Sequence, residues 1–444
     1  MNSRRRKSGS KRPWVHRCRI LTYTTLALFL TDYFLIHPAQ VDPVDLPPPE
    51  PGIRKLAARL SRHVHFLASP ELAGRQPGTP GNRSAENYLV GELEQYGLAA
   101  LSPQAAGANG FRTQPIAPDI GSNVYSALTG ASPDRRWILV GAHFDHLGEE
   151  DGKTFLGADD NASGVAILLE TARILQSRAR SRNFNFLFVA FNSEESPYFL
   201  TQRMGSHHFV HHLDDLGLRP EDIGLAIIMD LMGGVRWEPL RETVFVMGAE
   251  KSPELESLIG QVTVPGLTIL PMSMRMAESV PTTGGMIFSD YQAFRQIGAP
   301  FLFLSSGRTP DYHRPTDTAD RLHYARMART TRWLVQLLET LDARTTPFRQ
   351  DRRRENYVQD YRSLLPLIEA AATWTGKVPQ TGWITLGKLK QDRGRLQRIG
   401  EKIRRGENLG PEEGRALSLA SIRLQCLLGN MGPCFLLPGQ EEGA

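Results

Sequence analysis

Cysteine is scarce in this sequence, with three residues (Cys18, Cys426 and Cys434) among 444. So few cysteines exclude a disulfide scaffold and a structural zinc site built from thiolates. Tandem repeats of about 20 to 50 residues are also missing, which excludes a solenoid or a propeller. The sequence has no G-x-S-x-G pattern, so a serine nucleophile on a strand-to-helix turn is not expected either.

A strong charge of one sign is missing from the body of the chain. The formal net charge is +5, but residues 1–19 contain eight Lys or Arg and no acid, so the remainder carries −3. This balance gives no reason to expect a nucleic-acid partner. A composition that is 41% hydrophobic and 22% charged is typical of a globular protein, and 444 residues suffice for two or three domains.

The N-terminus has the pattern of a targeting segment. A basic tail, residues 1–19, precedes an apolar run at residues 20–36, and this order places the amino end in the cytoplasm. The run fits either an uncleaved signal anchor or a cleaved signal peptide, and we favour the anchor because cleavage after Ala39 would put His37 where a small residue is required. We therefore expect the rest of the chain outside the cytoplasm, periplasmic or extracellular, where Cys426 and Cys434 could form a disulfide or stay as two buried thiols.

A proline-rich linker, residues 37–53, leads into the main domain, which we place at residues 54–346. Short apolar runs alternate there with segments of helical spacing. The runs that predict strands are residues 123–128, 137–140, 183–191, 225–229, 243–247, 267–270 and 300–304. This alternation predicts an α/β fold with a mostly parallel central sheet and helices on both faces.

Beyond residue 346 the composition changes to basic residues set among Leu and Ile at helical spacing. We interpret residues 347–444 as a helical appendage of unknown role, with a helix that begins near Pro411. Its basic character fits a solvated helix face better than nucleic-acid or lipid binding.

Acids and histidines follow several of the predicted buried strands. They are His143 and Asp145, the pair Glu194 and Glu195, Asp230, and His313 in the loop after residue 304, while Asp159 stands at a helix start. The carboxyl ends of parallel strands meet at one edge of a sheet, so we expect these side chains to converge. Imidazole nitrogens and carboxylate oxygens are zinc ligands, and the set suits two metal ions about 3.5–4 Å apart.

The same residues resemble a known family. HFD at 143–145, GADDNASG at 157–164, the EE pair at 194–195, Asp230 and YHRPTDT at 312–318 are similar to motifs of the di-zinc exopeptidases of the bacterial leucyl aminopeptidase and aminopeptidase Y type. The resemblance spans about residues 54–345 and includes ASPELAGRQPGTPGN near its start. GADDNASG followed by an EE pair is specific, whereas HxD alone is weak.

The resemblance implies five ligands for two Zn²⁺ ions: His143 and Asp230 for one, Glu195 and His313 for the other, and Asp159 as the bridge. It implies that Glu194 is the general base. It also implies that Asp145 accepts the ring N–H of His143 and fixes its tautomer. Asp160 is expected to bind no metal, and the bond between Asp159 and Asp160 is expected to be cis.

The function that follows is a zinc-dependent aminopeptidase acting on short peptides. A carboxypeptidase or dipeptidase on the same scaffold is an alternative, and a glutaminyl cyclase with one zinc is a more distant one. A non-catalytic binding ectodomain is disfavoured because the ligands and the base are all present. The segment SPYFLTQRM, residues 196–204, departs from the family pattern and leaves the side-chain specificity open.

Overall fold

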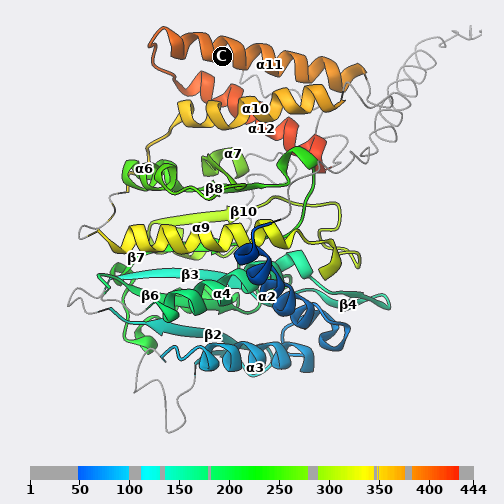
Figure 1. The fold of residues 1–444 in the computed structure, drawn as a ribbon, viewed down its shortest axis with the longest axis vertical. Coiled ribbons are helices and arrows are strands. Elements are labelled where there is room, and N and C mark those ends of the chain that lie inside the picture. Colours follow the sequence, from blue (N-terminus) through cyan, green and yellow to red (C-terminus); the bar gives the residue numbers. More distant parts are fainter. Residues whose placement is uncertain are drawn as a thin grey trace, which may run out of the picture.

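The computed structural model describes residues 49–99, 112–130, 136–178, 182–278, 289–344, 348, 350–375 and 383–429. Its centre is an eight-stranded sheet (Figure 1). In spatial order the strands are β1 (Thr113–Ala117), β2 (Gly121–Leu128), β6 (Asn185–Phe191), β3 (Trp137–His143), β7 (Ile223–Met229), β10 (Phe301–Ser305), β8 (Thr243–Met247) and β9 (Thr268–Met272). A small hairpin, β4 (Gly148–Glu150) and β5 (Lys153–Phe155), forms a second sheet.

The sheet contains both parallel and antiparallel pairs. Its central strands β6, β3, β7 and β10 run parallel to one another, and β9 runs parallel to β8. Antiparallel pairing joins β1 to β2, β2 to β6 and β8 to β10. Residues 118–120 alone connect β1 to β2, and a connection this short permits only an antiparallel pair. The prediction of a mostly parallel sheet therefore holds for the central strands and for β8 with β9, and the three antiparallel pairs depart from it.

The central strands are buried on both faces, which explains their continuous apolar sequences. Successive side chains of a strand point to opposite faces, so each strand contributes to two hydrophobic cores. On β3, Ile138 and Val140 belong to one core, whereas Trp137 and Leu139 belong to the other. Residues 185–191 of β6 divide between the two cores in the same way.

Helices cover both faces of this sheet (Figure 1), as the sequence predicted. One face carries α2 (Pro51–Leu67), α3 (Pro80–Gln95), α4 (Gly164–Ser177), α6 (Pro253–Gln261) and α9 (Tyr324–Asp342). The other face carries α5 (Gly205–His211), α7 (Met274–Glu278) and α8 (Tyr291–Ile297). With both faces covered, the carboxyl edge of the parallel strands is left as the place where polar side chains can gather.

The C-terminal residues predicted to be helical contain α10 (Tyr357–Thr375), α11 (Trp383–Arg404) and α12 (Pro411–Gly429). These three helices lie beyond the β9 edge (Figure 1) and share a hydrophobic core with Trp237, Leu240 and Met276. Asp360 of α10 joins them to the sheet domain, since its carboxylate accepts hydrogen bonds from Ser273 N at 2.8 Å and Arg275 Nη2 at 2.9 Å.

Several predictions fall outside the described residues. They are the basic tail (1–19), the membrane anchor (20–36), the linker up to residue 48, the side chain of Cys426, and Cys434. Among the helices that the structure describes, none combines the length and the apolar character needed to cross a bilayer. The anchor and the location outside the cytoplasm therefore stay predictions.

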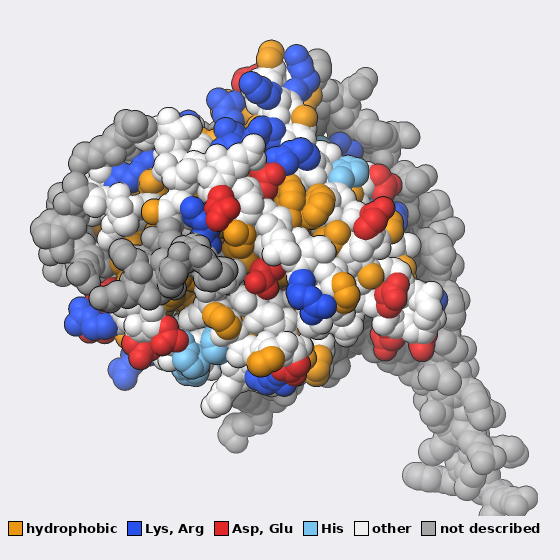
Figure 2. Space-filling view, turned by 90° about the horizontal axis from the view of Figure 1, so that it is seen from below, with side chains coloured by type: hydrophobic (Ala, Val, Ile, Leu, Met, Phe, Trp, Pro, Cys, Tyr) orange, Lys and Arg blue, Asp and Glu red, His pale blue; other side chains and the backbone are white. Residues whose placement is uncertain are grey.

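The surface seen in Figure 2 mixes charges of both signs. Lys and Arg side chains gather toward its upper edge, while Asp and Glu are spread over the rest. In the described part of the chain, the large hydrophobic side chains classed as exposed are Phe66 and Leu200, at 37% and 42%. Hydrophobic side chains elsewhere on this face are scattered, which is ordinary for a globular protein.

Candidate metal centre

Three neighbouring strands deliver polar side chains to one edge of the sheet. Strand β3 ends at His143, and the loop after it carries Asp145 and His146. Strand β6 is followed by Glu194 and Glu195, and β7 by residue 230, an aspartate. The parallel arrangement of these strands places their carboxyl ends side by side, as expected from the sequence.

One group of side chains surrounds the Nε2 atom of His143. Asp160 Oδ1 lies 3.4 Å from it, Asp230 Oδ1 lies 3.5 Å from it, and Glu194 Oε2 lies 3.9 Å from it. All four side chains are buried. Atoms that share a tetrahedral zinc ion lie roughly 3 to 4 Å apart, because each is about 2 Å from the ion. This group therefore has the dimensions of a metal site.

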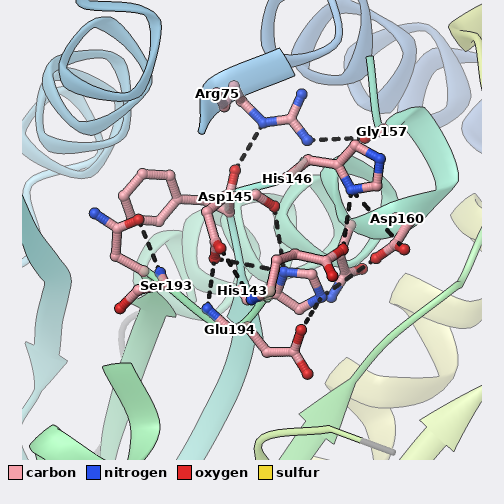
Figure 3. Close-up of polar contacts among 12 residues, drawn as sticks. Arg75, His143, Asp145, His146, Gly157, Asp160, Ser193 and Glu194 are labelled. Atoms are coloured by element: carbon pink, nitrogen blue, oxygen red, sulfur yellow. Dashed lines mark hydrogen bonds and ion pairs between the residues drawn. The ribbon is translucent and has the colours of Figure 1, made fainter. Parts of the chain in front are cut away.

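A second group lies beside the first and shares Asp160 with it (Figure 3). His313 Nε2 lies 3.1 Å from Asp160 Oδ2 and 3.2 Å from Glu195 Oε1. His146 Nδ1 lies 3.1 Å from the same Glu195 oxygen. Asp160 thus directs one carboxylate oxygen to each group, which is the geometry of a bridging ligand.

Polar atoms at the centre of both groups lack ordinary hydrogen bonds. Among the described residues, these buried atoms include His143 Nε2, Asp160 Oδ2, Asp230 Oδ1 and His313 Nε2. Buried polar atoms normally find partners, so unpaired nitrogens and oxygens that face one another indicate a place for a cation. Nitrogen and oxygen donors without thiolates fit zinc.

The charges of the two groups also indicate a place for cations. Burial lowers the pKa of His313, but its contacts with Asp160 and Glu195 outweigh burial and raise the pKa to about 10. For His143, burial is likewise outweighed by Glu194 and the neighbouring aspartates, and its pKa rises well above the usual value. Negative charge therefore exceeds positive charge here, and bound cations would compensate it.

The structure reverses the positions that the sequence predicted for two adjacent aspartates. Asp159 does not face the histidines: its Oδ1 accepts hydrogen bonds from Gly233 N at 2.7 Å and Gly234 N at 2.9 Å. Asp160 instead lies between the two histidines, with Oδ1 near His143 and Oδ2 near His313. The cis peptide bond also lies one residue later than expected, between Asp160 and Asn161. Because adjacent side chains point in different directions, the sequence alone could not show which aspartate faces the centre.

Asp145 also differs from its predicted contact. The hydrogen bond at His143 Nδ1 goes to the backbone carbonyl of Asp145, at 3.3 Å, while the carboxylate Oδ1 is 3.7 Å away. The carboxylate of Asp145 accepts instead from the backbone amides of Glu194 and Glu195, at 3.0 and 3.1 Å. Asp145 therefore orients the loop that carries both glutamates.

Sequence reasoning assigned no role to three residues that shape the centre. They are His146, Arg75 and Asp317, which lie in the motifs HFDH, AGR and PTDT. Asp317 accepts hydrogen bonds from the amides of Asp159 and Asp160, at 2.8 and 3.1 Å. The sequence contains one indication of their importance, because all three lie in or beside the motifs that resemble the exopeptidase family.

Arg75 fastens two loops of the centre together (Figure 3). Its buried guanidinium donates to the carbonyl oxygens of Phe144, Leu156 and Gly157, at 2.7, 2.6 and 2.9 Å. Burial lowers the pKa of Arg75 to about 10, with Asp145 and Asp317 opposing the shift, so the side chain stays charged at neutral pH. One cation therefore fixes the loop after β3 against the loop before Asp160.

Part of this chain is similar to known proteins. Residues 123–338 match the description "Peptidase family M28". The uncharacterized protein YfbL of Escherichia coli (strain K12) is 30% identical over 221 residues, which cover 45% of this chain and 66% of YfbL. Aminopeptidase YwaD of Bacillus subtilis (strain 168) is 27% identical over 197 residues, which cover 43% of this chain and 38% of YwaD. A third or more of each of these relatives is thus left unmatched.

A more distant relative and a solved structure extend the comparison. Glutaminyl-peptide cyclotransferase of Bos taurus is 24% identical over 282 residues, which cover 57% of this chain and 74% of that protein. The LapA aminopeptidase of Legionella pneumophila has a similar fold, with a TM-score of 0.51 at 16% identity over 69% of this chain and 79% of LapA. Residues 123–338, which contain both groups of side chains, therefore carry the likeness to peptidase family M28.

Proposed function

We propose that the chain is a zinc-dependent aminopeptidase with two Zn²⁺ ions. His143 and Asp230 would hold one ion, Glu195 and His313 would hold the other, and Asp160 would contribute an oxygen to each. The observation that supports this best is the placement of Asp160 Oδ1 3.4 Å from His143 Nε2 and Asp160 Oδ2 3.1 Å from His313 Nε2. A carboxylate between two histidines on opposite sides suits a pair of ions.

Zinc, when bound, lowers the pKa of water and polarises the scissile carbonyl. Glu194 then takes a proton from the attacking water and passes it to the leaving amine. Its position suits this role, because it directs Oε2 toward the His143 group while Glu195 faces the other. Burial raises the pKa of Glu194 well above its usual value, with Glu195 adding to the shift and His143 opposing it. A raised pKa makes this carboxylate a stronger base toward the attacking water.

The buried acids at this edge of the sheet do not by themselves select a substrate. Asp160, Glu194, Glu195 and Asp230 are all buried there. Two bound Zn²⁺ ions would compensate their charge, so these acids neither attract a free α-amino group nor repel a C-terminal carboxylate. The name of YwaD, an aminopeptidase, favours a substrate with a free α-amino group. Carboxypeptidase activity is therefore the weaker alternative.

A glutaminyl cyclase is the second candidate function. The bovine relative supports it by its name. A single-zinc enzyme would leave the second histidine–carboxylate group without a purpose, and both groups have comparable dimensions here. We therefore prefer hydrolysis by a two-metal site over cyclisation by one.

A panel of substrates tests the proposal. Aminoacyl and C-terminal chromogenic peptides, together with an N-terminal glutaminyl peptide, are assayed with and without a chelator, and zinc is counted in the purified protein. We expect chelator-sensitive release from the aminoacyl substrates and two zinc ions per chain. Hydrolysis of the C-terminal probes alone, or cyclisation alone, would replace the proposal with the matching alternative.

The variant Glu194→Gln tests the base. We expect kcat to fall by about 10²–10⁴, the usual contribution of a general base, with zinc content unchanged. Glu150→Gln on the exposed hairpin is the matched control and leaves kcat unchanged. Full activity of Glu194→Gln would refute its role.

A further inference from the structure

His146 approaches the metal centre from a side that the five proposed ligands leave open. Its Nδ1 lies 3.1 Å from Glu195 Oε1 and 3.9 Å from Asp160 Oδ2. His313 Nε2 approaches the same two oxygens, at 3.2 and 3.1 Å. The two imidazole rings meet at 70°, with centroids 5.8 Å apart. Two nitrogens from different loops therefore face one pair of carboxylate oxygens.

The ring of His146 is held in this position by its surroundings. The side chain has no exposure to solvent. Gly157, in a left-handed conformation at φ +61°, packs so closely that a Cβ atom there would lie 2.4 Å from His146 Cγ. The carbonyl of Gly157 is in turn fixed by Arg75 at 2.9 Å (Figure 3). His146 is thus built into the centre rather than placed loosely beside it.

We infer that His146 is a further protein ligand, through Nδ1, of the zinc ion held by Glu195 and His313. The inference rests on the proposed two-zinc function. With Asp160 Oδ2, this ion gains two nitrogen and two oxygen ligands from the protein, which fills a tetrahedral set. The ion of the His143 group keeps three, namely His143, Asp230 and Asp160 Oδ1, and retains an open position.

This asymmetry assigns different tasks to the two positions. A zinc ion with four protein ligands is closed, as in structural sites, whereas an open position is typical of catalytic sites. Glu194 lies within 4.8 Å of the ligand atoms of the open group, together with His143 and Asp230. The reacting water therefore belongs to the His143 side, and the His146 side binds its ion more tightly.

A hydrogen bond from His146 to Glu195 is the competing explanation, and the variant His146→Asn separates the two. Asparagine Nδ2 occupies nearly the place of imidazole Nδ1, so it keeps a donor to Glu195 but lacks the nitrogen lone pair that a metal needs. Loss of a group that only orients a ligand costs about 10–100-fold in zinc affinity, and a retained donor reduces that cost. Loss of a ligand costs more, and we expect the tighter zinc affinity of His146→Asn to fall by at least about 100-fold.

Two measurements on the full chain provide the readout. Competition with a chelator gives the affinity of each zinc ion, and X-ray absorption at the zinc edge counts imidazoles. We expect three histidines for two zinc ions in the wild type and two in His146→Asn. His207→Asn is the control, because His207 is a buried histidine that belongs to neither group. We expect His207→Asn to leave the zinc affinities and the number of imidazoles unchanged.

The possible results separate this inference from the proposed function. Two zinc ions and full aminopeptidase activity in the wild type, with an unchanged affinity and two imidazoles in both proteins, would overturn the role of His146 alone. A wild type that binds no zinc would overturn both.

Discussion

Asp145 and Asp317 share one pattern of contacts at the candidate metal centre. Each carboxylate accepts hydrogen bonds from two consecutive backbone amides. Asp145 binds those of residues 194 and 195, at 3.0 and 3.1 Å, and Asp317 binds those of residues 159 and 160, at 2.8 and 3.1 Å. Three of the four residues held in this way, Glu194, Glu195 and Asp160, direct their carboxylates into the centre. The loops that carry the proposed ligands are therefore positioned by carboxylates that need not touch a metal.

The two hydrogen bonds that Asp317 accepts from backbone amides predict a loss of zinc affinity in Asp317→Asn. The new amide group presents hydrogen atoms to the backbone N–H of Asp159 or Asp160, so one hydrogen bond is lost and Asp160 shifts. We expect zinc affinity to fall by about 10–100-fold, as for other groups that orient a ligand. Competition with a chelator measures it. Asp320→Asn, an exposed change three residues away, is the control, and equal affinities for the two variants would contradict the role of Asp317.

The positions of Asp159 and Asp160 predict opposite effects on zinc content in two matched variants. Asp160→Asn removes the shared ligand, and we expect the zinc content to fall from two ions to one or none. Asp159→Asn should keep its zinc and lose no more than about 1 kcal/mol of stability, because its amide oxygen can still accept from the amides of Gly233 and Gly234 and only the charge is removed. Elemental analysis and urea unfolding measure the two effects. Zinc loss in Asp159→Asn with zinc retained in Asp160→Asn would show that Asp159 is the shared ligand, as the sequence predicted.

Much of the fold could be predicted from sequence because burial leaves a clear pattern. The apolar runs at residues 137–140 and 183–191 correspond to the central strands β3 and β6. The helix expected to begin near Pro411 is α12, which begins at that residue. Edge pairing was not predictable in the same way, because apolar content does not tell parallel from antiparallel neighbours.

The candidate site was predictable in its parts but not in its orientations. The strand ends identified His143, Glu194, Glu195 and Asp230, since topology alone brings them together. The direction of each side chain depends on local backbone geometry, which is why Asp159 and Asp160 were exchanged. His146, Arg75 and Asp317 act through contacts between loops far apart in the sequence, and no spacing rule reveals such contacts.

The contacts of Arg75 predict a large loss of stability in Arg75→Lys. Lysine keeps the charge but cannot reach the separate carbonyls of Phe144, Leu156 and Gly157 together. Leaving two or more buried acceptors unpaired should cost on the order of 4 kcal/mol. Urea unfolding of the zinc-free protein measures this. Arg83→Lys is the control, because Arg83 donates to the carbonyl of Gly78 at the exposed surface, and we expect a change within about 0.5 kcal/mol. A loss below about 1 kcal/mol in Arg75→Lys would show that the loops hold without this guanidinium.

A buried ion cluster between α2 and α4 predicts a pH dependence of stability. Glu170 accepts hydrogen bonds from Arg59 Nε and Arg173 Nε, both at 2.9 Å, and lies 3.1 Å from His63 Nε2. Burial raises the pKa of Glu170, but these three partners outweigh burial and lower it to about 2 from its usual 4.5. A lowered pKa in the folded state stabilises the protein above pH 4.5, and this stability is lost as the pH falls toward 2.

The variant Glu170→Gln isolates this contribution. From the two pKa values, the free energy of unfolding of the wild type should fall by about 2 kcal/mol more than that of Glu170→Gln between about pH 5.5 and pH 3. The variant is less stable at the higher pH, because it leaves Arg59, Arg173 and His63 without their anion, and the gap between the two proteins narrows as the acid titrates. Urea unfolding at several pH values measures both curves, since all other acids contribute equally to each. Parallel curves over this range would mean that Glu170 keeps an ordinary pKa despite its three partners.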